Sequence, residues 1–168
     1  SLLDEQIDVS YAVSHQSGIY ALDFQLGDDK TVIFNSGSGS VDVSKNSITA
    51  SQKLQNNTVV YLYGEFDQSA QTFGAISDGK IQAKQRKVSG KDAAVALSFS
   101  KGGGQLHFRY GISFIDAEQA KRNLRREITG FNVQRVADAG REVWNKSLST
   151  VTVSGGEADD RAVFYTSL

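Results

Sequence analysis

The chain of 168 residues contains no cysteine, no proline and no methionine. Without cysteine it can form neither disulfide bonds nor thiolate metal sites, and its redox compartment stays open. Without proline, which averages about 5% of residues, its turns must be made by glycine, asparagine, aspartate and serine. Without methionine, Ser1 cannot be a translation start, so we expect the chain to be a piece of a longer polypeptide.

Long apolar runs and an excess of one charge are also lacking. No apolar run approaches the roughly 18 residues of a membrane-spanning helix, and the start "SLLDEQIDV" has neither the basic nor the apolar region of a signal peptide. Lysine and arginine total 18, against 19 for aspartate and glutamate. We therefore predict no nucleic-acid partner and no membrane partner. The 39% of apolar residues suits one domain, with or without an appendage.

Residues 7 to about 114 show the period-two alternation of antiparallel strands. In residues 7–13, isoleucine, valine, tyrosine and valine alternate with polar or small residues. We expect strands at 7–13, 20–26, 31–34, 40–44, 47–51, 58–66, 80–88, 93–99 and 105–114. Short segments rich in glycine, asparagine, aspartate and serine separate them. This pattern predicts an antiparallel β-sandwich or barrel.

The alternation stops at Phe114, and a helical spacing begins at Asp116. Asp116 is a suitable N-cap, and Gln119 follows three residues later as in a capping box. We expect this helix to end near Gly130, which would adopt the left-handed conformation that follows many helices. Its apolar residues are Ala117, Ala120, Leu124 and Ile128. Its basic residues form either a solvated face or a contact with an acid-lined domain; they are Lys121, Arg122, Arg125 and Arg126.

Two further helices are expected. Asn132 would cap the second helix, whose apolar side carries Val133, Val136, Ala137, Gly140, Val143 and Trp144. A strand-like segment follows at 149–156, and acidic residues then open a third helix at 157–168. That helix stops mid-pattern at Leu168, so we expect the chain to be cut inside it. The predicted organisation is a sandwich portion over residues 1–115 and helices over 116–168.

Few residues in the chain carry reactive chemistry. The only histidines are His15, in a turn-like segment, and His107, on the face opposite the apolar stripe of its strand. A zinc site would need both of them plus carboxylates, and no spacing brings them together. The simpler interpretation of His107 is a residue on the surface of the sheet.

Known catalytic and binding motifs are also lacking. There is no G-x-S-x-G elbow. The glycine-rich segments 37–40 and 101–105 lack the features of a phosphate loop, and we expect both to be hairpin turns. The "DGK" segment at 78–80 is too short for an EF-hand loop.

Two groups of carboxylates are candidates for the acid pair that glycosidases need. Glu65 and Asp67 lie on one face of a strand, where a polar solvent face is the simpler interpretation. Helix capping explains the second group, which comprises Glu157, Asp159 and Asp160. We therefore assign no catalytic and no metal-binding residue, and substrate-binding residues stay unknown.

Aromatic side chains give one weaker indication. Tyr61 and Tyr63 share a strand face with Phe66 close by, and such a stripe can stack on sugar rings. A sandwich core explains the same residues more simply.

From residue 109 onward the sequence resembles glycoside hydrolase family 92, the calcium-dependent exo-α-mannosidases. The matching elements come in the order of the family. They are Gly111 to Phe114; Ala120, Asn123, Leu124 and Glu127; Phe131, Ala139, Trp144 and Leu148; Val151 and Val153; and Phe164, Tyr165, Thr166 and Leu168. The β region is similar to the family only in style.

The resemblance implies an N-terminal β-sandwich, supersandwich-like, joined by linker helices to an (α/α)6 barrel. Asp116 would begin the linker, and residues 160–168 would be a truncated first barrel helix. The apolar stripes at Leu124 and at Val136 and Trp144 would pack against the sandwich or the barrel. The C-terminal (α/α)6 domain is therefore the expected partner, and self-association of the isolated chain is a second one.

The resemblance also implies an α-1,2-mannosidase acting on α-mannoside glycans, with calcium as cofactor. Its catalytic acid, base and calcium ligands would all lie downstream of Leu168, so the isolated chain is expected to be inactive. Such enzymes are usually secreted, periplasmic or on the cell surface. Two alternatives stay open: a free-standing carbohydrate-binding or adhesion module, and a structural module of an unrelated large protein.

Overall fold

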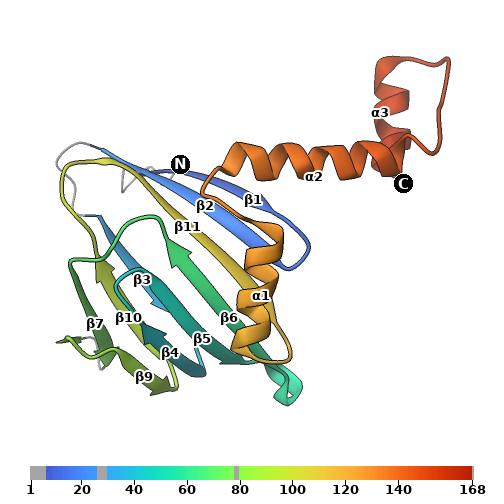
Figure 1. The fold of residues 1–168 in the computed structure, drawn as a ribbon. Helices are drawn as coiled ribbons and strands as arrows, with labels where there is room; N and C mark the ends of the chain where they lie inside the picture. The colour runs from blue at the N-terminus through green and yellow to red at the C-terminus, as the bar shows by residue number, and fades with distance from the viewer. Residues whose placement is uncertain (1–6, 26–29, 78–79, 168) are drawn as a thin grey trace.

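A computed structural model describes residues 7–25, 30–77 and 80–167 as two antiparallel sheets followed by three helices (Figure 1). The large sheet has the strand order β1-β2-β11-β6-β5-β4-β9, and the small sheet has the order β3-β10-β7-β8. This arrangement confirms the predicted fold class, a mainly β sandwich followed by C-terminal helices. Within the described ranges, no helix is long and apolar enough to cross a membrane.

The strands have the following bounds. The large sheet contains β1 (Ile7–Val13), β2 (Ser17–Phe24), β4 (Gly39–Val43), β5 (Ser47–Lys53), β6 (Val59–Phe66), β9 (Lys87–Gly90) and β11 (Gly104–Ser113). The small sheet contains β3 (Thr31–Asn35), β7 (Thr72–Ser77), β8 (Lys80–Ala83) and β10 (Ala94–Ser98). A single 3₁₀ turn, η1 (Gln55–Asn57), lies between β5 and β6.

The main hydrophobic core lies between the two sheets. Because side chains alternate across a strand, each strand of the large sheet contributes one apolar face to this core. The buried members are Phe24, Val41, Val43, Ile48, Ala50, Phe66, Ala70, Val95, Leu97, Phe99 and Leu106. Full burial of one such large side chain stabilises the fold by about 1.5–3 kcal/mol.

Two strand predictions were wrong. The strand β7 was not predicted, and the single strand predicted at 80–88 is two strands, β8 and β9, which belong to different sheets. Lys84, between them, has φ of 66°, so the chain turns there. Gly74 interrupts the alternation of β7, and a side chain at this position would meet Gln82 O at 2.7 Å on the paired strand β8.

The two glycine-rich segments are not hairpin turns, which corrects a second prediction. The segment after β3 leads from the small sheet to β4 in the large sheet, and the segment after β10 leads to β11 in the same way. Gly37, Gly102 and Gly103 all have positive φ, which glycine adopts without strain. Alternation along a strand identifies the strand but not its sheet, and so the sequence did not reveal these crossovers.

The helices are α1 (Ala117–Glu127), α2 (Val133–Leu148) and α3 (Ala158–Thr166). Both predicted N-caps are confirmed: Asp116 Oδ1 accepts from the N–H of Gln119 at 2.6 Å, and Asn132 Oδ1 accepts from the N–H of Arg135 at 2.9 Å. The prediction for Gly130 was wrong, because Ile128 follows the last residue of α1 in an extended conformation and Gly130 is not among the glycines with positive φ. The segment 149–156 was predicted as strand-like and contains no strand.

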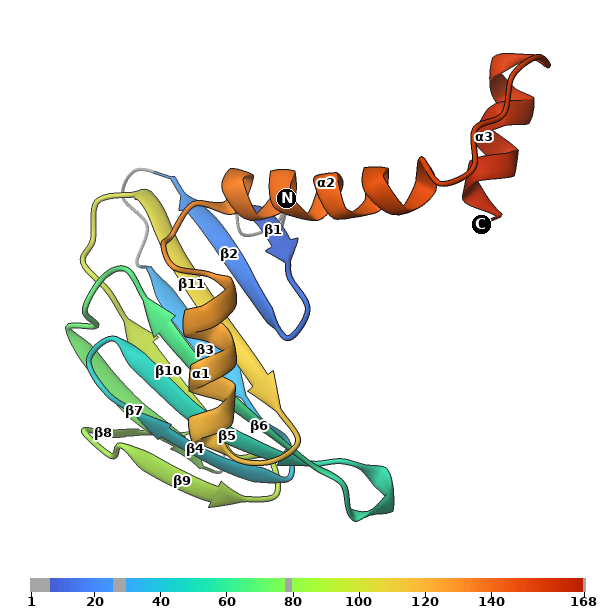
Figure 2. The same cartoon turned by 45° about the vertical axis from the view of Figure 1, so that its right-hand side comes forward.

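Each successive helix lies farther from the sandwich. Figure 2 shows α1 lying against the large sheet, α2 extending away from β1, and α3 at the far end of α2. Helix α1 therefore covers the outer face of the large sheet mainly over β11 and β6, and the first half of α2 covers it over β1 and β2. The predicted division of the chain at residue 115 stays a prediction.

Candidate functional site: the seam between sandwich and helices

Helix α1 docks on β11 at a glycine. A Cβ atom built on Gly111 would collide with the backbone of α1, where it would lie 2.8 Å from the N atom of Leu124. The side chains of Ala120 and Leu124 are both 0% exposed over this position. A second buried cluster forms here from Ala12, Ile19, Leu124 and Ile128. Glycine at 111 is therefore the residue that lets helix and strand approach this closely.

Asn123 joins the same helix to the same strand through polar contacts. Its side chain is buried, and its Nδ2 donates to the carbonyl of Ile112 at 2.9 Å. Its Oδ1 accepts from Gln119 Nε2 at 2.8 Å and from Arg126 at 3.3 Å. A buried amide that is hydrogen-bonded in this way fixes the rotation and height of α1 on the sheet.

Glu127 attaches the end of α1 to the turn between β1 and β2. Its carboxylate accepts from the backbone N–H of Gln16 at 2.8 Å and pairs with Arg126 at 2.9 Å. Burial works to raise the pKa of Glu127, but these hydrogen bonds outweigh it, so the pKa lies below its ordinary value. The ionised form therefore holds this turn to the helix.

A charged network lies beside α1. It crosses the interface between the large sheet and the helices, which we call the seam. Arg109 on β11 pairs with Glu65 on β6 at 2.5 Å and donates to the carbonyl of Ile128 at 2.8 Å. Its guanidinium also lies over the ring of Phe131, 4.6 Å from the centroid. Tyr63 donates to the other oxygen of Glu65 at 2.9 Å. Burial works to raise the pKa of Glu65, but Arg109 and Tyr63 outweigh it and lower the pKa.

These two depressed pKa values predict a loss of stability in acid. A carboxyl whose pKa is lower in the folded state stabilises the fold above its unfolded pKa, near 4.5, and this contribution is lost as pH falls further. We expect the free energy of unfolding to decrease below pH 4.5 and this slope to become smaller in Glu65→Gln. Urea titrations at a series of pH values from neutral to acid measure the free energy of unfolding and therefore this slope. Glu142→Gln, on an exposed surface of α2, is the control, and an equal change of slope in both variants would contradict the prediction.

Glu65 and Asp67 lie on the same outer face of the large sheet, as predicted, but each is held by its own partner on β11. Glu65 is paired with Arg109, whereas Asp67 accepts from His107 through both its backbone N–H at 3.0 Å and its Nδ1 at 2.7 Å. Each carboxylate therefore has its own cationic or polar partner. Of the acidic group at α3, Asp160 accepts from the N–H of Glu157 at 3.2 Å, which is a capping interaction as predicted.

The two histidines lie apart. His107 pairs in register with Ala21 of β2, whereas His15 lies in the turn that precedes β2. Within the described residues no group of three or more histidines, aspartates and glutamates could hold a metal ion. His107 lies on the outer face of the large sheet, as the sequence indicated.

The aromatic residues of β6 lie on opposite faces. Tyr63 packs beneath α1, with Lys121 Nζ 5.1 Å from its ring centroid, whereas Phe66 is 3% exposed in the main core. Tyr61 has the same parity in the strand as Tyr63. Phe66 therefore belongs to no aromatic stripe with the two tyrosines, and the helix covers Tyr63.

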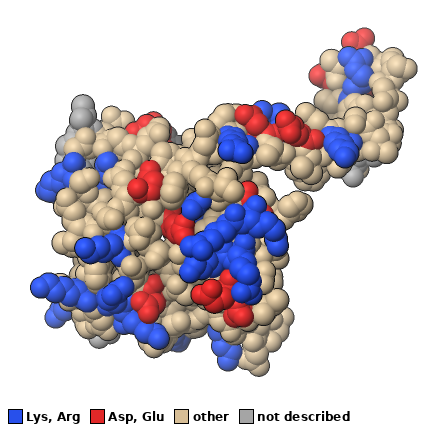
Figure 3. Space-filling model, viewed as in Figure 1, with Lys and Arg blue, Asp and Glu red and all other residues tan. Residues whose placement is uncertain are grey.

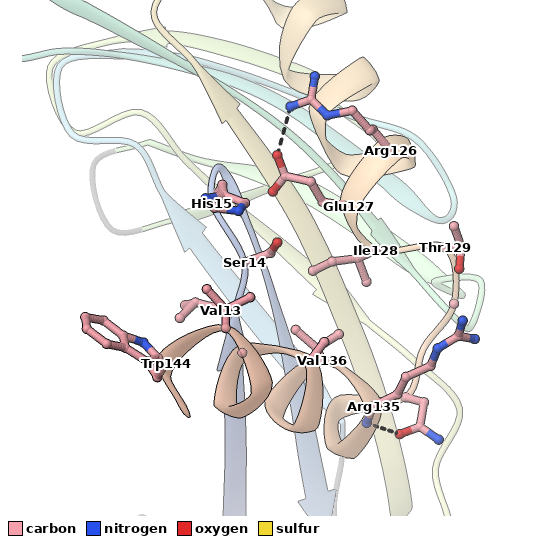
Figure 4. A pocket seen from close by; sticks show the side chains of 15 residues that line it. Val13, Ser14, His15, Arg126, Glu127, Ile128, Thr129, Arg135, Val136 and Trp144 are labelled. Atoms are coloured by element: carbon pink, nitrogen blue, oxygen red, sulfur yellow. Dashed lines mark hydrogen bonds and ion pairs between the residues drawn. The ribbon is translucent and has the colours of Figure 1, made fainter. Parts of the chain in front are cut away.

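A groove of about 640 Å³ lies between the β1–β2 turn, the end of α1 and one side of α2 (Figure 4). Apolar side chains from α2 form much of its wall, and Trp144 stands at one end, 69% exposed. His15, Arg126, Glu127 and Arg135 add polar groups to the lining. Much of the charge of the lining is already engaged, because Glu127 and Arg126 pair with each other.

Basic side chains gather over α1 (Figure 3). Arg125 and Arg126 are each 62% exposed, although Arg125 also approaches Glu65 at 3.8 Å and Arg126 pairs with Glu127. The predicted basic face of this helix is thus largely solvated in the described residues.

The seam residues of α1 are the ones through which the sequence resembles family 92, and comparison with known proteins tests that resemblance. The family model described as the glycosyl hydrolase family 92 N-terminal domain matches residues 1–113. The model of the family 92 catalytic domain matches residues 119–168. The chain belongs to glycosyl hydrolase family 92. This membership confirms the resemblance stated from the sequence.

Solved structures of family 92 share the fold. The inverting mannosidase BT2199 from Bacteroides thetaiotaomicron VPI-5482 superposes with a TM-score of 0.82 at 24% identity, over 90% of this chain and 22% of its own. The α-mannosidase BT3965 from Bacteroides thetaiotaomicron gives 0.82 at 16% identity, over 92% and 24%. The family 92 glycosyl hydrolase ccman5 gives 0.81 at 20% identity, over 95% and 24%. A comparison with proteins of curated function gives no match.

The chain therefore spans less than a quarter of the length of these solved family 92 relatives. The residues Ala120, Asn123, Leu124 and Glu127, which carried the resemblance in α1, all serve to dock this helix on the sandwich. Arg109 and Gly111 also contact α1 across this interface; Gly111 belongs to the matching element 111–114, whereas Arg109 was not singled out from the sequence. The sequence did contain an indication of this role. Arg109 and Gly111 alternate with the apolar residues of β11 and therefore lie on the opposite face of the strand, where α1 packs.

Proposed function

We propose that the chain is the sandwich-and-linker region of an α-1,2-mannosidase of family 92, where it supports an (α/α)6 catalytic domain. The docking of α1 on the large sheet carries this proposal. Gly111, Asn123 and Glu127 hold the first residues of the catalytic-domain match rigidly on the sandwich. A rigid support of this kind is what a neighbouring catalytic domain needs if its site is to keep its geometry.

The uncovered part of α2 supports the proposed partner. The first half of its apolar side, at Val133 and Val136, packs against the sandwich. The same side continues with Val143 and Trp144, which are 55% and 69% exposed. An apolar helix face that is covered at one end only fits a helical domain packing on the remainder.

Catalysis and calcium binding are proposed to reside elsewhere in the enzyme. The described residues do not fit a calcium site, because no group of acidic side chains among them could hold a metal ion. Each paired carboxylate at the seam is already neutralised by its own partner. On the family resemblance, we assign the catalytic acid, the base and the calcium ligands to the helical domain. We also propose export of the enzyme from the cytoplasm, as for family members generally, and the lack of cysteine is compatible with it.

The proposal predicts activity in the full-length protein and none in the 168-residue chain. We expect the full-length enzyme to release mannose from an α-1,2-mannobiose, to lose that activity with a chelator and to regain it with calcium. The isolated chain should release no mannose under the same conditions, and circular dichroism should show that it is folded. Mannose release by the isolated chain, or a full-length protein inactive on α-mannosides in calcium, would overturn the proposal. Mannose binding by the isolated chain, measured by calorimetry, would favour a carbohydrate-binding module instead.

A further inference from the structure

Helices α1 and α2 are joined by a short turn with little packing of its own. Residues 128–131 separate the last residue of α1 from Asn132, the N-cap of α2. Thr129 and Gly130 in the middle of the turn are exposed, and a Cβ atom added at Gly130 would meet nothing within 4 Å. The two ends of the turn, Ile128 and Phe131, are buried and half-buried. The direction in which α2 leaves the sandwich therefore depends on what holds these two ends.

Arg109 on β11 contacts both ends of the turn. Its Nη1 donates to the carbonyl of Ile128 at 2.8 Å, and its guanidinium lies over the ring of Phe131, 4.6 Å from the centroid. Its Nη2 pairs with Glu65 on β6 at 2.5 Å, and Tyr63 donates to the other carboxylate oxygen. The side chain of Arg109 is 13% exposed, so solvent screens these contacts little. Arg109 is thus fixed on two inner strands of the large sheet while it holds the turn.

Apolar packing alone defines the direction of α2 less well. Val133 and Val136, at the start of the helix, pack on the second buried cluster, and the helix contacts β1 and β2. Such packing is non-directional, whereas a guanidinium fork that holds two hydrogen-bond acceptors has a fixed geometry. Val143 and Trp144, further along α2, are 55% and 69% exposed. Among the described residues, the far half of α2 therefore adds little support.

Helix α2 is a lever that enlarges any change at its start. Its 16 residues span about 24 Å at 1.5 Å per residue. A tilt of about 10° at the turn would therefore move its far end by about 4 Å. Figure 2 shows α2 pointing away from the sandwich with α3 at its far end, and both helices belong to the segment that matches the family 92 catalytic domain. A small change at Arg109 should thus displace this segment much more than the turn itself.

We propose that Arg109 is a positioning residue of the enzyme: it holds the turn between α1 and α2, and thereby fixes the direction of α2 and the placement of the catalytic domain on the sandwich. The inference rests on the proposed function, because it takes the catalytic domain to follow α2. A displacement of about 1 Å in a catalytic site can cost about a hundredfold in rate. An error in the direction of α2 should therefore be visible in kcat, although Arg109 itself performs no chemistry.

Spin-label distances test the direction of α2 without any assay of activity. Because the 168 residues include no cysteine, Ser89→Cys on β9 and Lys146→Cys in the last turn of α2 give one labelled pair. We expect a narrow distance distribution for this pair, and one that is broader or shifted by about 4 Å when Arg109→Lys is added. Lysine keeps the charge but replaces the planar fork with a single nitrogen, which cannot hold all three partners of Arg109 together.

Arg86→Lys is the matched control. Arg86 Nε also donates to a backbone carbonyl, that of Val43 at 3.0 Å, but it lies just before β9, at the opposite end of the large sheet from β1. We expect this substitution to leave the distance distribution unchanged. An identical distribution with and without Arg109→Lys would overturn the inference, as would equal changes with Arg86→Lys and Arg109→Lys.

Kinetics of the full-length protein test the consequence for the reaction. Mannose release from α-1,2-mannobiose, measured well below the Tm, should show a kcat about tenfold lower in Arg109→Lys, with KM changed less than about twofold. Arg86→Lys should leave both constants unchanged. A merely structural role would lower the Tm of Arg109→Lys and leave its kcat unchanged, and that result would overturn the inference.

The two experiments separate this inference from the proposed function. A full-length protein inactive on α-mannosides would overturn the proposed function and the catalytic part of the inference, whereas the label distances would still decide whether Arg109 sets the direction of α2. If Arg109→Lys does not fold, Phe131→Leu is the second variant, because it removes the ring under the guanidinium and keeps the ion pair with Glu65. It should broaden the label distances in the same way, and an unchanged distribution would again overturn the inference.

Discussion

Gly111→Ala is expected to loosen α1 from the sandwich and to lower the free energy of unfolding by about 3 kcal/mol. The new methyl group would meet the backbone of Ala120 and Leu124, and backbone atoms in the middle of a helix cannot move aside as a side-chain end can. The helix must therefore shift, and Leu124, which is fully buried, loses contacts with Ile19 and Ile128. Urea unfolding followed by circular dichroism measures the change.

Gly140→Ala is the control with the opposite sign. Gly140 lies inside α2, and an added Cβ would approach the carbonyl of Val13 no closer than 3.8 Å, an ordinary contact. Alanine in a helix interior is favoured over glycine by roughly 0.5–1 kcal/mol, so this variant should be slightly more stable. Equal effects of the two substitutions would show that close approach at Gly111 does not govern the docking of α1.

Local chemistry made the helix starts predictable. Asp116 and Asn132 cap α1 and α2 as expected, because an N-cap depends only on a side chain and the backbone two or three residues ahead. The alternation of β1 and β11 was also visible, since one face of each strand meets the core. The end of α1 was not predictable in the same way, because Gly130 adopts no left-handed conformation and Ile128 instead turns into the buried cluster.

The pairing of segments that are distant in the chain could not be predicted from the sequence. Nothing in the alternation near Gly37 distinguishes a hairpin from a crossover between sheets, because both need a turn with positive φ. The partner of Arg109 could have been any nearby carboxylate, and only the register of β6 against β11 places Glu65 opposite it. The candidate site was therefore predictable through the residues of α1 that resemble family 92, but not through what each of them contacts.

Asn123→Leu is expected to destabilise the chain by about 3 kcal/mol, although leucine has a similar size and is a better helix former. Asn123 Nδ2 donates to the carbonyl of Ile112, and removal of the amide leaves this partly buried acceptor without that donor. An unsatisfied buried polar group costs about 1–3 kcal/mol. Gln119 and Arg126 also lose the Oδ1 atom to which they donate.

Gln119→Ala distinguishes the hydrogen bond that Asn123 Oδ1 accepts within α1 from the one that its Nδ2 donates to β11. It removes the donor to Oδ1 at the partly solvated side but leaves the bond to Ile112 intact, so we expect a loss of only about 0.5 kcal/mol. Urea unfolding of both variants, with hydrogen exchange of α1, measures the difference. If the bond between helix and strand fixes the docking, Asn123→Leu accelerates exchange throughout α1, whereas Gln119→Ala affects only its first turn. Equal losses in the two variants would instead mean that Asn123 acts within the helix, and that the burial of Leu124 on Gly111 alone holds α1 to the sandwich.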